Sequence, residues 1–161
     1  MALELYRIDD RLIHGQVVVG WGQPLDLRFI VLVDDEVAAS DWEQELYRMG
    51  VPPDMDIYFD TVESAAQNLS RYKDDERRGI LLTGDIGTMT RLVDATDDIR
   101  RVNVGGIHHK PGRTQRLRYV FLTPAEEAQL RALAARGLEV SAQDVPAARP
   151  LPLDEVLQGT G

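Results

Sequence analysis

The segment RIDDRLIHGQ, residues 7–16, brings together side chains that phosphoryl transfer uses. His14 is one of 3 histidines in the chain, and two aspartates, Asp9 and Asp10, precede it within five positions. A carboxylate can hold one ring N–H of an imidazole, and the other nitrogen is then free to attack an electrophile. Either aspartate could serve, so the spacing predicts a nucleophilic histidine with an orienting carboxylate.

Arginines in the same segment add the charge that a phosphoryl group requires. Arg7 or Arg11 could bind phosphoryl oxygens, because a guanidinium group donates to them bidentately. A helix predicted over 15–22 would begin just after His14, where the helix dipole disfavours protonation of the ring and free backbone N–H groups face any anion. The combination describes a phosphohistidine site. The alternative is that His14 caps the backbone and that Asp-Asp-Arg forms a turn with a local ion pair.

The elements that must position this segment alternate between strands and helices. Apolar runs rich in β-branched residues predict strands, and periodic segments between them predict helices. The expected strands are 3–8, 28–33, 55–59, 79–82, 101–104, 117–122 and 138–145. In a doubly wound sheet, ligands bind outside the carboxyl ends of the strands, so His14 is expected at such an edge.

Helix ends are marked by capping residues. Ser40 is the expected N-cap of a helix through 41–49 that Gly50 ends, and Asp60 with Glu63 has capping-box spacing for a helix to about residue 72. A further helix is expected over 88–95. Thr123 as N-cap, proline at N1 and glutamate at N3 mark the next one, which Gly137 closes.

The segment 105–116 interrupts the alternation, because it has no helical periodicity before the next expected strand. Parallel neighbours need a crossover helix, so the strand at 117–122 is expected to be antiparallel or displaced. We therefore expect one α/β domain over 1–161, with a doubly wound, mainly parallel sheet, one antiparallel strand and helices on both faces. Residues 148–161 are expected to form a surface tail.

Composition narrows the possible partners. The net charge of −9 argues against nucleic acid, although arginines at 7, 11, 113, 116 and 118 could still form one cationic pocket. The chain has no cysteine, which excludes disulfides and thiolate metal sites. Neither a secretory signal nor an apolar run long enough to cross a bilayer is found, so a cytoplasmic location is expected.

RIDDRLIHGQVVVGW resembles the amino-terminal signature of the enzyme IIB component of the mannose/fructose/sorbose family of the bacterial phosphoenolpyruvate-dependent sugar phosphotransferase system. VDDEVAAS at 33–40, VPPDMD at 51–56, RVNVGGIHHKPGRTQ at 101–115 and RGLEVSAQDVP, ending at residue 146, also resemble that family, in the same order. The resemblance covers nearly the whole chain.

The resemblance implies a phosphocarrier enzyme, a protein-N(pi)-phosphohistidine-sugar phosphotransferase. His14 would accept the phosphoryl group on Nδ1 from a phosphorylated IIA component and pass it to a sugar held by the membrane subunits IIC and IID. Asp10 and Arg11 match the motif as positioning residues, and Gln16 would line the helix start. No cofactor or metal is implied. A homodimer is possible, and the sugar is not specified by this sequence.

Six further residues, inside and outside the motif, are expected to line the phosphoryl site: Arg7, Gly15, Gln16, Asp85, Lys110 and Arg113. The chain departs from the family pattern at Thr83-Gly84-Asp85, which replaces an Asn-Pro pair, and at His108-His109. The altered loop motivates an alternative, a phosphohistidine signalling relay that regulates another protein without sugar transport. A third possibility is a non-catalytic anion-binding module. The three histidines and several aspartates could also build a metal site, but their spacing does not require one.

Overall fold

A seven-stranded sheet forms the centre of the described part of the protein. The structure is a computed structural model that describes residues 3–14 and 16–158. Neighbouring strands are parallel except for the last pair, β8 and β9. Across the sheet the order is β3 (Asp56–Asp60), β2 (Leu27–Val33), β4 (Arg78–Thr83), β1 (Leu3–Ile8), β5 (Arg101–Val104), β8 (Glu139–Ala142) and β9 (Leu151–Pro152).

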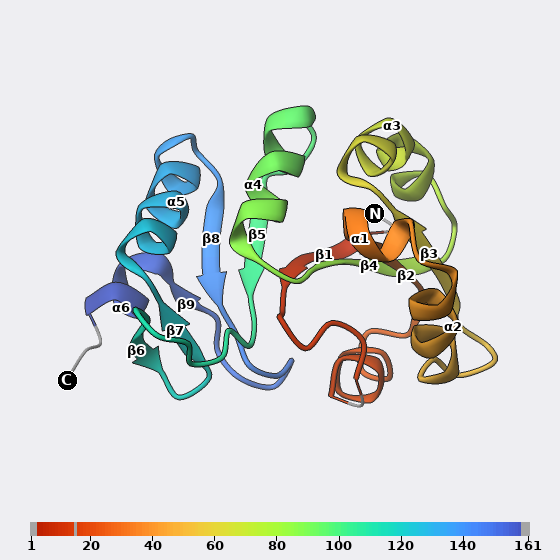
Figure 1. Ribbon diagram of the computed structural model, residues 1–161, viewed down its shortest axis with the longest axis horizontal. Helices are drawn as coiled ribbons and strands as arrows, with labels where there is room; N and C mark the ends of the chain where they lie inside the picture. The colour runs from red at the N-terminus through yellow and green to blue at the C-terminus, as the bar shows by residue number, and fades with distance from the viewer. Residues whose placement is uncertain (1–2, 15, 159–161) are drawn as a thin grey trace.

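Helices cover both faces of this sheet (Figure 1). The helices are η1, a π-helix (Gln16–Trp21), α1 (Asp35–Ala38), α2 (Asp41–Met49), α3 (Val62–Lys73), α4 (Ile86–Ala95), α5 (Pro124–Ala135) and α6 (Leu153–Gln158). In Figure 1, α3 and α4 lie above the sheet, and η1 and α2 lie below it. This is the expected doubly wound α/β fold.

Side-chain alternation along the central strands divides the core into two layers. In β2, Val31 and Val33 pack with α3 and α4, whereas Ile30 and Leu32 face the other way, toward η1 and α1. All four are nearly completely buried. A strand that is buried on both faces reads as a continuous apolar run, which is why FIVLV was recognisable in the sequence.

The strand predicted over 117–122 is wrong in its bounds. Residues 114–122 form a separate antiparallel hairpin of β6 (Thr114–Leu117) and β7 (Val120–Leu122). The segment predicted as a strand over 117–122 therefore lies outside the main sheet. Of the two expected alternatives, an antiparallel or a displaced strand, displacement from the main sheet is confirmed. The antiparallel strand of the main sheet is instead β9, which pairs with β8.

The carboxyl-terminal segment does more than lie on the surface. After β9, α6 buries Leu153, Val156 and Leu157 against the layer that contains α5. The proline-rich composition of 146–152 hid this strand, because proline is unusual in strands except at edges. β9 is such an edge strand.

Two helix starts differ from their predictions. Thr61, rather than Asp60, is the N-cap of α3, and its side chain accepts from Ser64 N. Asp60 ends β3 and accepts a 2.7 Å hydrogen bond from the Tyr72 hydroxyl. Helix α4 begins at Ile86, two residues before the predicted start, because Asp85 caps it. The capping box of Thr123 and Glu126 is present as predicted.

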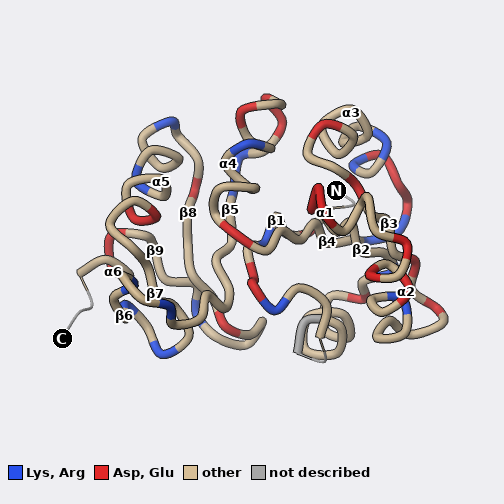
Figure 2. Tube along the Cα trace, viewed as in Figure 1, with Lys and Arg blue, Asp and Glu red and all other residues tan. Residues whose placement is uncertain are grey.

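Charged side chains are distributed unevenly over this fold (Figure 2). Acidic residues gather on α1 and around α2, whereas basic residues lie on the β6–β7 hairpin. Arg113, Arg116 and Arg118 do not form one cationic pocket with Arg7 and Arg11: they pair with acidic side chains, namely Glu126, Glu127 and Asp144.

Candidate active site

The segment that follows β1 crosses the carboxyl ends of the neighbouring strands. Asp9 N donates to the carbonyl of Thr83 at the end of β4, and Gly105 N, just after β5, donates to the carbonyl of Ile8. Asp10 N donates to the carbonyl of Gly106. These backbone bonds, each of 2.7–2.9 Å, hold the first residues of the motif at the edge where ligands bind in such sheets.

Asp9 lies at the centre of the site. Its carboxylate is completely buried and accepts from both flanking arginines. Arg11 donates from Nε to Oδ1 at 3.0 Å and from Nη2 to Oδ2 at 2.9 Å, a bidentate pair. Arg7 donates from Nη2 to Oδ2 at 3.3 Å. Two guanidinium groups therefore share the single negative charge of Asp9.

These contacts fix the ionisation of the group. Burial alone would raise the pKa of Asp9, but the hydrogen bonds from Arg11 and the charge of Arg7 outweigh it, so the pKa lies below its usual value of 3.8. The hydrogen bond with Asp9 raises the pKa of Arg11, against the smaller effect of burial. Asp9 and Arg11 are therefore ionised together.

Arg7 is a buried cation that joins four segments of the chain. Its Nη1 donates to the side chain of Asn103 and to the carbonyl of Gln143, and its guanidinium carbon lies 4.7 Å from the centre of the Trp21 ring. Burial lowers the pKa of Arg7 and the charge of Asp9 opposes this. A buried charge needs such partners. Arg7 therefore links Asp9 to Asn103, Gln143 and Trp21 beneath the surface of the site.

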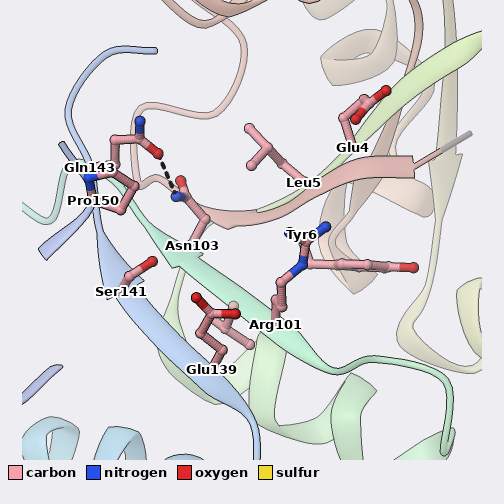
Figure 3. Close-up of a pocket in the computed structure, with 10 residues that line it drawn as sticks. Glu4, Leu5, Tyr6, Arg101, Asn103, Glu139, Ser141, Gln143 and Pro150 are labelled. Carbon is pink, nitrogen blue, oxygen red and sulfur yellow. Dashed lines mark hydrogen bonds between the residues drawn. The ribbon is translucent and has the colours of Figure 1, made fainter. Parts of the chain in front are cut away.

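Asn103 and Gln143 extend this network along the sheet. Figure 3 shows their side chains pointing toward each other, and Asn103 Nδ2 donates to Gln143 Oε1 at 3.3 Å. They border a hollow of about 130 Å³ over β1, β5 and β8, whose polar lining includes Arg101 and Glu139. His14 is not part of that lining.

Gly105 and Gly106 are glycines because the arginines approach them closely. A Cβ on Gly105 would lie 2.3 Å from Arg7 Nη2 and 2.7 Å from Asp9 Oδ2, and one on Gly106 would lie 3.0 Å from Arg11 Nε. Neither glycine has a positive φ, so backbone conformation is not the reason for glycine at these positions. Their function is to leave room for the charged groups.

His14 is partly exposed, with 22% of its side chain accessible, but its two ring nitrogens differ. Nε2 is buried and lies 3.9 Å from Asp9 Oδ1. Burial lowers the pKa of His14, and the charge of Arg11 lowers it further. Nε2 is thus turned inward, toward the Asp9 carboxylate, in a ring whose neutral form is favoured.

Asp10 does not make this contact, although the sequence favoured it as the positioning residue. Its carboxylate accepts from His108, at 2.7 Å from the backbone N and at 2.6 Å from the ring Nδ1. Asp10 is therefore hydrogen-bonded to the ring of His108, whereas Asp9 faces Nε2 of His14 at the longer distance of 3.9 Å.

The other predicted site residues are less closely associated with His14. Arg113 donates bidentately to Glu126 at 2.8–3.0 Å and from Nη1 to the carbonyl of His108, so it fixes the loop to the start of α5. Lys110 is exposed in that loop. Asp85 caps α4 through Thr88.

Two predictions fall on the boundary of the described residues. Gly15 lies outside them. The backbone of Gln16 begins η1, but its side chain is not part of the described structure. The carbonyl of His14 accepts from Val18 N at 3.0 Å, which joins the loop to this helix.

Sequence reasoning missed Asn103 and Gln143, and it left Asp9 as an alternative. A polar residue at an inward position of the strand RVNV was the available signal for Asn103, since buried polar groups need partners. Within residues 3–14 and 16–158, no group of three His, Asp or Glu side chains is placed to hold a metal ion.

The geometry agrees with what comparison with known proteins finds. The model of the sorbose subfamily IIB component of the phosphotransferase system (PTS) matches residues 3–161. This chain belongs to that family. The activity of this IIB component is phosphoryl transfer in sugar transport, and components of this family work with IIA proteins and with membrane IIC and IID subunits.

Individual relatives resemble the IIB component over most of its length. It is 34% identical over 145 residues to the N-acetylgalactosamine-specific phosphotransferase enzyme IIB component 1 of Escherichia coli K12, covering 88% of this chain and 90% of that protein. It is 33% identical to the mannose-specific EIIAB component of the same organism, of which it covers 45%. The crystal structure of manxB from Thermoanaerobacter tengcongensis superimposes with a TM-score of 0.86 at 30% identity, over 97% of this chain and 95% of the other.

Proposed function

We propose that His14 accepts a phosphoryl group on Nδ1 from the phosphohistidine of a IIA component and passes it to a sugar bound by the membrane subunits. The observation that carries this proposal is the burial of Nε2 against Asp9, which leaves Nδ1 of a partly exposed, neutral ring for the reaction. In the first step the donor P–N bond breaks as the Nδ1–P bond forms. In the second step a sugar hydroxyl oxygen displaces His14 from phosphorus and its proton is released.

The arginine pair supplies the charge for both steps. Arg11 is partly exposed beside His14, whereas Arg7 is buried, so Arg11 is the guanidinium that an incoming phosphoryl group can reach. Asp9 orients His14 and fixes both arginines. Phosphoryl transfer depends mainly on positioning and charge stabilisation, which this arrangement provides without further groups.

Partners follow from the same chemistry. The mannose-specific EIIAB relative has IIA and IIB in its name, which supports a IIA protein as donor. No helix among the described residues is long and apolar enough to span a membrane. We propose that this component acts at the cytoplasmic side of the inner membrane, where it meets IIC and IID. We also propose that the protein forms a homodimer, and a molar mass from light scattering twice that of the chain would support this.

The direct test of the function is transfer of label. Wild-type protein, His14→Ala and the control His109→Ala are incubated with labelled phosphoenolpyruvate, the general phosphotransferase proteins and a mannose-family IIA. Wild type and control are expected to acquire acid-labile phosphate and His14→Ala is not. Vesicles containing IIC and IID then test transfer to sugar. Equal labelling of His14→Ala would refute the assignment of the acceptor.

A further inference from the structure

His108 is the second imidazole at this edge of the sheet, and its orientation is fixed. Asp10 binds it twice, through the backbone N–H at 2.7 Å and through ring Nδ1 at 2.6 Å. Because an ionised carboxylate only accepts, Nδ1 must carry the proton in this bond. The other nitrogen, Nε2, belongs to a side chain that is 64% exposed. Asp10 thus fixes the ring of His108, and we call it the held ring; its Nε2 belongs to the exposed side chain and is available to a ligand.

The held ring lies beside the phosphoryl acceptor. Asp10 comes four residues before His14, and its backbone N–H is bonded to Gly106, two residues before His108. Burial is the largest cause of the lowered pKa of His14, and a positive charge on His108 is a smaller one, so the two rings interact electrostatically. Arg113 supports the same loop by donating to the carbonyl of His108 at 2.7 Å.

His109 lacks this arrangement, which makes it a matched control. Its ring packs edge-on against Phe121, with the ring centres 5.5 Å apart. Adjacent residues of an extended segment point in different directions. Only the first histidine of the pair is oriented by a carboxylate of the motif.

We propose that His108 is a phosphoryl-binding residue of this protein: Asp10 orients its ring so that Nε2–H donates to an oxygen of the phosphoryl group on His14. This inference rests on the proposed role of His14. An imidazolium between the Asp10 carboxylate and a phosphoryl dianion satisfies both anions, and Arg11 completes the set of donors from the other side. Asp10, matched to the family motif by sequence, thereby acts through His108 rather than through His14.

The groups that face His108 define how its effect depends on pH. They are the carboxylate of Asp10, the ring of His14 and the positively charged guanidinium of Arg113, which donates to the His108 carbonyl. A phosphoryl group on His14 would add negative charge beside them. As pH rises and His108 loses its Nε2 proton, its hydrogen bond to the phosphoryl group is lost.

The test compares the lifetime of the labelled phosphoprotein in wild type, His108→Gln, His108→Arg and His109→Gln. Hydrogen bonds to charged groups contribute enough that His108→Gln is expected to lose phosphate about 10- to 100-fold faster, with His109→Gln unchanged. His108→Arg is expected to restore the lifetime and to keep it at high pH, where the advantage of wild type over His108→Gln disappears. A merely structural role for His108 would not produce this pH dependence.

The outcomes separate this inference from the function on which it rests. If wild type is labelled but His108→Gln decays at the rate of His109→Gln, His108 does not bind the phosphoryl group and the inference is wrong. If wild type is not labelled by a competent donor, the proposed function itself fails, and the inference fails with it.

Discussion

Nε2 of His14 lies 3.9 Å from Oδ1 of Asp9, and the same carboxylate accepts hydrogen bonds from Arg7 and Arg11. One buried anion thus faces the His14 ring and holds both cations. The two guanidinium charges exceed the charge of the Asp9 carboxylate that they share, so the arginine pair supplies local positive charge within a protein whose net charge is −9. The carboxylates of Asp10 and Asp144 also act on Arg11. A phosphoryl dianion is attracted to such a site while the ring itself stays neutral.

The pKa of His14 is expected to lie below the ordinary histidine value of 6.5. Burial is the larger cause and Arg11 the next, so Arg11→Gln should raise the pKa only part of the way back. Since the unfolded chain takes up the proton first, this group lowers the free energy of unfolding as pH falls from 6.5 toward the folded-state pKa. NMR titration of the imidazole in both proteins measures the values, and a wild-type pKa at or above 6.5 would argue against a neutral nucleophile.

Asp9→Asn is expected to be much more damaging than Asp10→Asn. Removing the charge of Asp9 leaves the guanidinium of Arg7 buried without its counter-ion, which costs about 3 kcal/mol or more. Asp10 is partly exposed, so the same change there should cost about 1 kcal/mol. Urea unfolding gives both values, and the initial rate of phosphorylation should fall further in Asp9→Asn. Equal losses would mean that Asp9 is not the central carboxylate.

The pair Gly105→Ala and Gly50→Ala tests the close approach of the arginines. A methyl group at 105 would overlap Arg7 and Asp9, both completely buried, and overpacking of this kind costs about 1–3 kcal/mol. At Gly50 the nearest atom would be 3.6 Å away, an ordinary contact, so Gly50→Ala should change stability by no more than about 0.5 kcal/mol. Should both variants unfold at the wild-type urea concentration, the packing described around Gly105 is incorrect.

Arg113 offers a choice between two roles. If its bidentate pair with Glu126 holds the loop, Arg113→Gln and Glu126→Gln should show a coupling of about 1 kcal/mol in a double-mutant cycle, with little effect on the initial rate of His14 labelling. If Arg113 binds the phosphoryl group, as its position in the sequence suggested, labelling of Arg113→Gln should slow by at least about tenfold without loss of stability.

Much of this fold was predictable because the segments whose local sequence favours strand or helix are also the segments that the fold buries as strands and helices. The runs that form β1 and β5 have their predicted bounds. The capping box that begins α5 was predictable because all its hydrogen-bonding groups lie within the four residues 123–126. The β6–β7 hairpin was not predicted: residues up to 116 were assigned to the connection and 117–122 to one strand, because the turn at Arg118-Tyr119 contains neither glycine nor proline. Strand β9 was missed because proline concealed it.

The site was predictable in type but not in detail. The motif identified a histidine, carboxylates and arginines, yet consecutive residues leaving a strand point to different sides, so only the tertiary structure shows that Asp9 faces His14 and Asp10 faces His108. Asn103 and Gln143 meet Arg7 across 96 and 136 residues of sequence, a separation that local patterns cannot reveal.

The most direct test of this account is the location of the phosphoryl group. Protein labelled with ¹⁵N-histidine is phosphorylated through IIA, and long-range ¹H–¹⁵N correlation spectra identify the modified ring and nitrogen. With Nε2 of His14 buried against Asp9, the phosphoryl group is predicted on Nδ1 of His14 alone. Phosphate on Nε2 of His14, or on the ring of His108 or His109, would contradict the account.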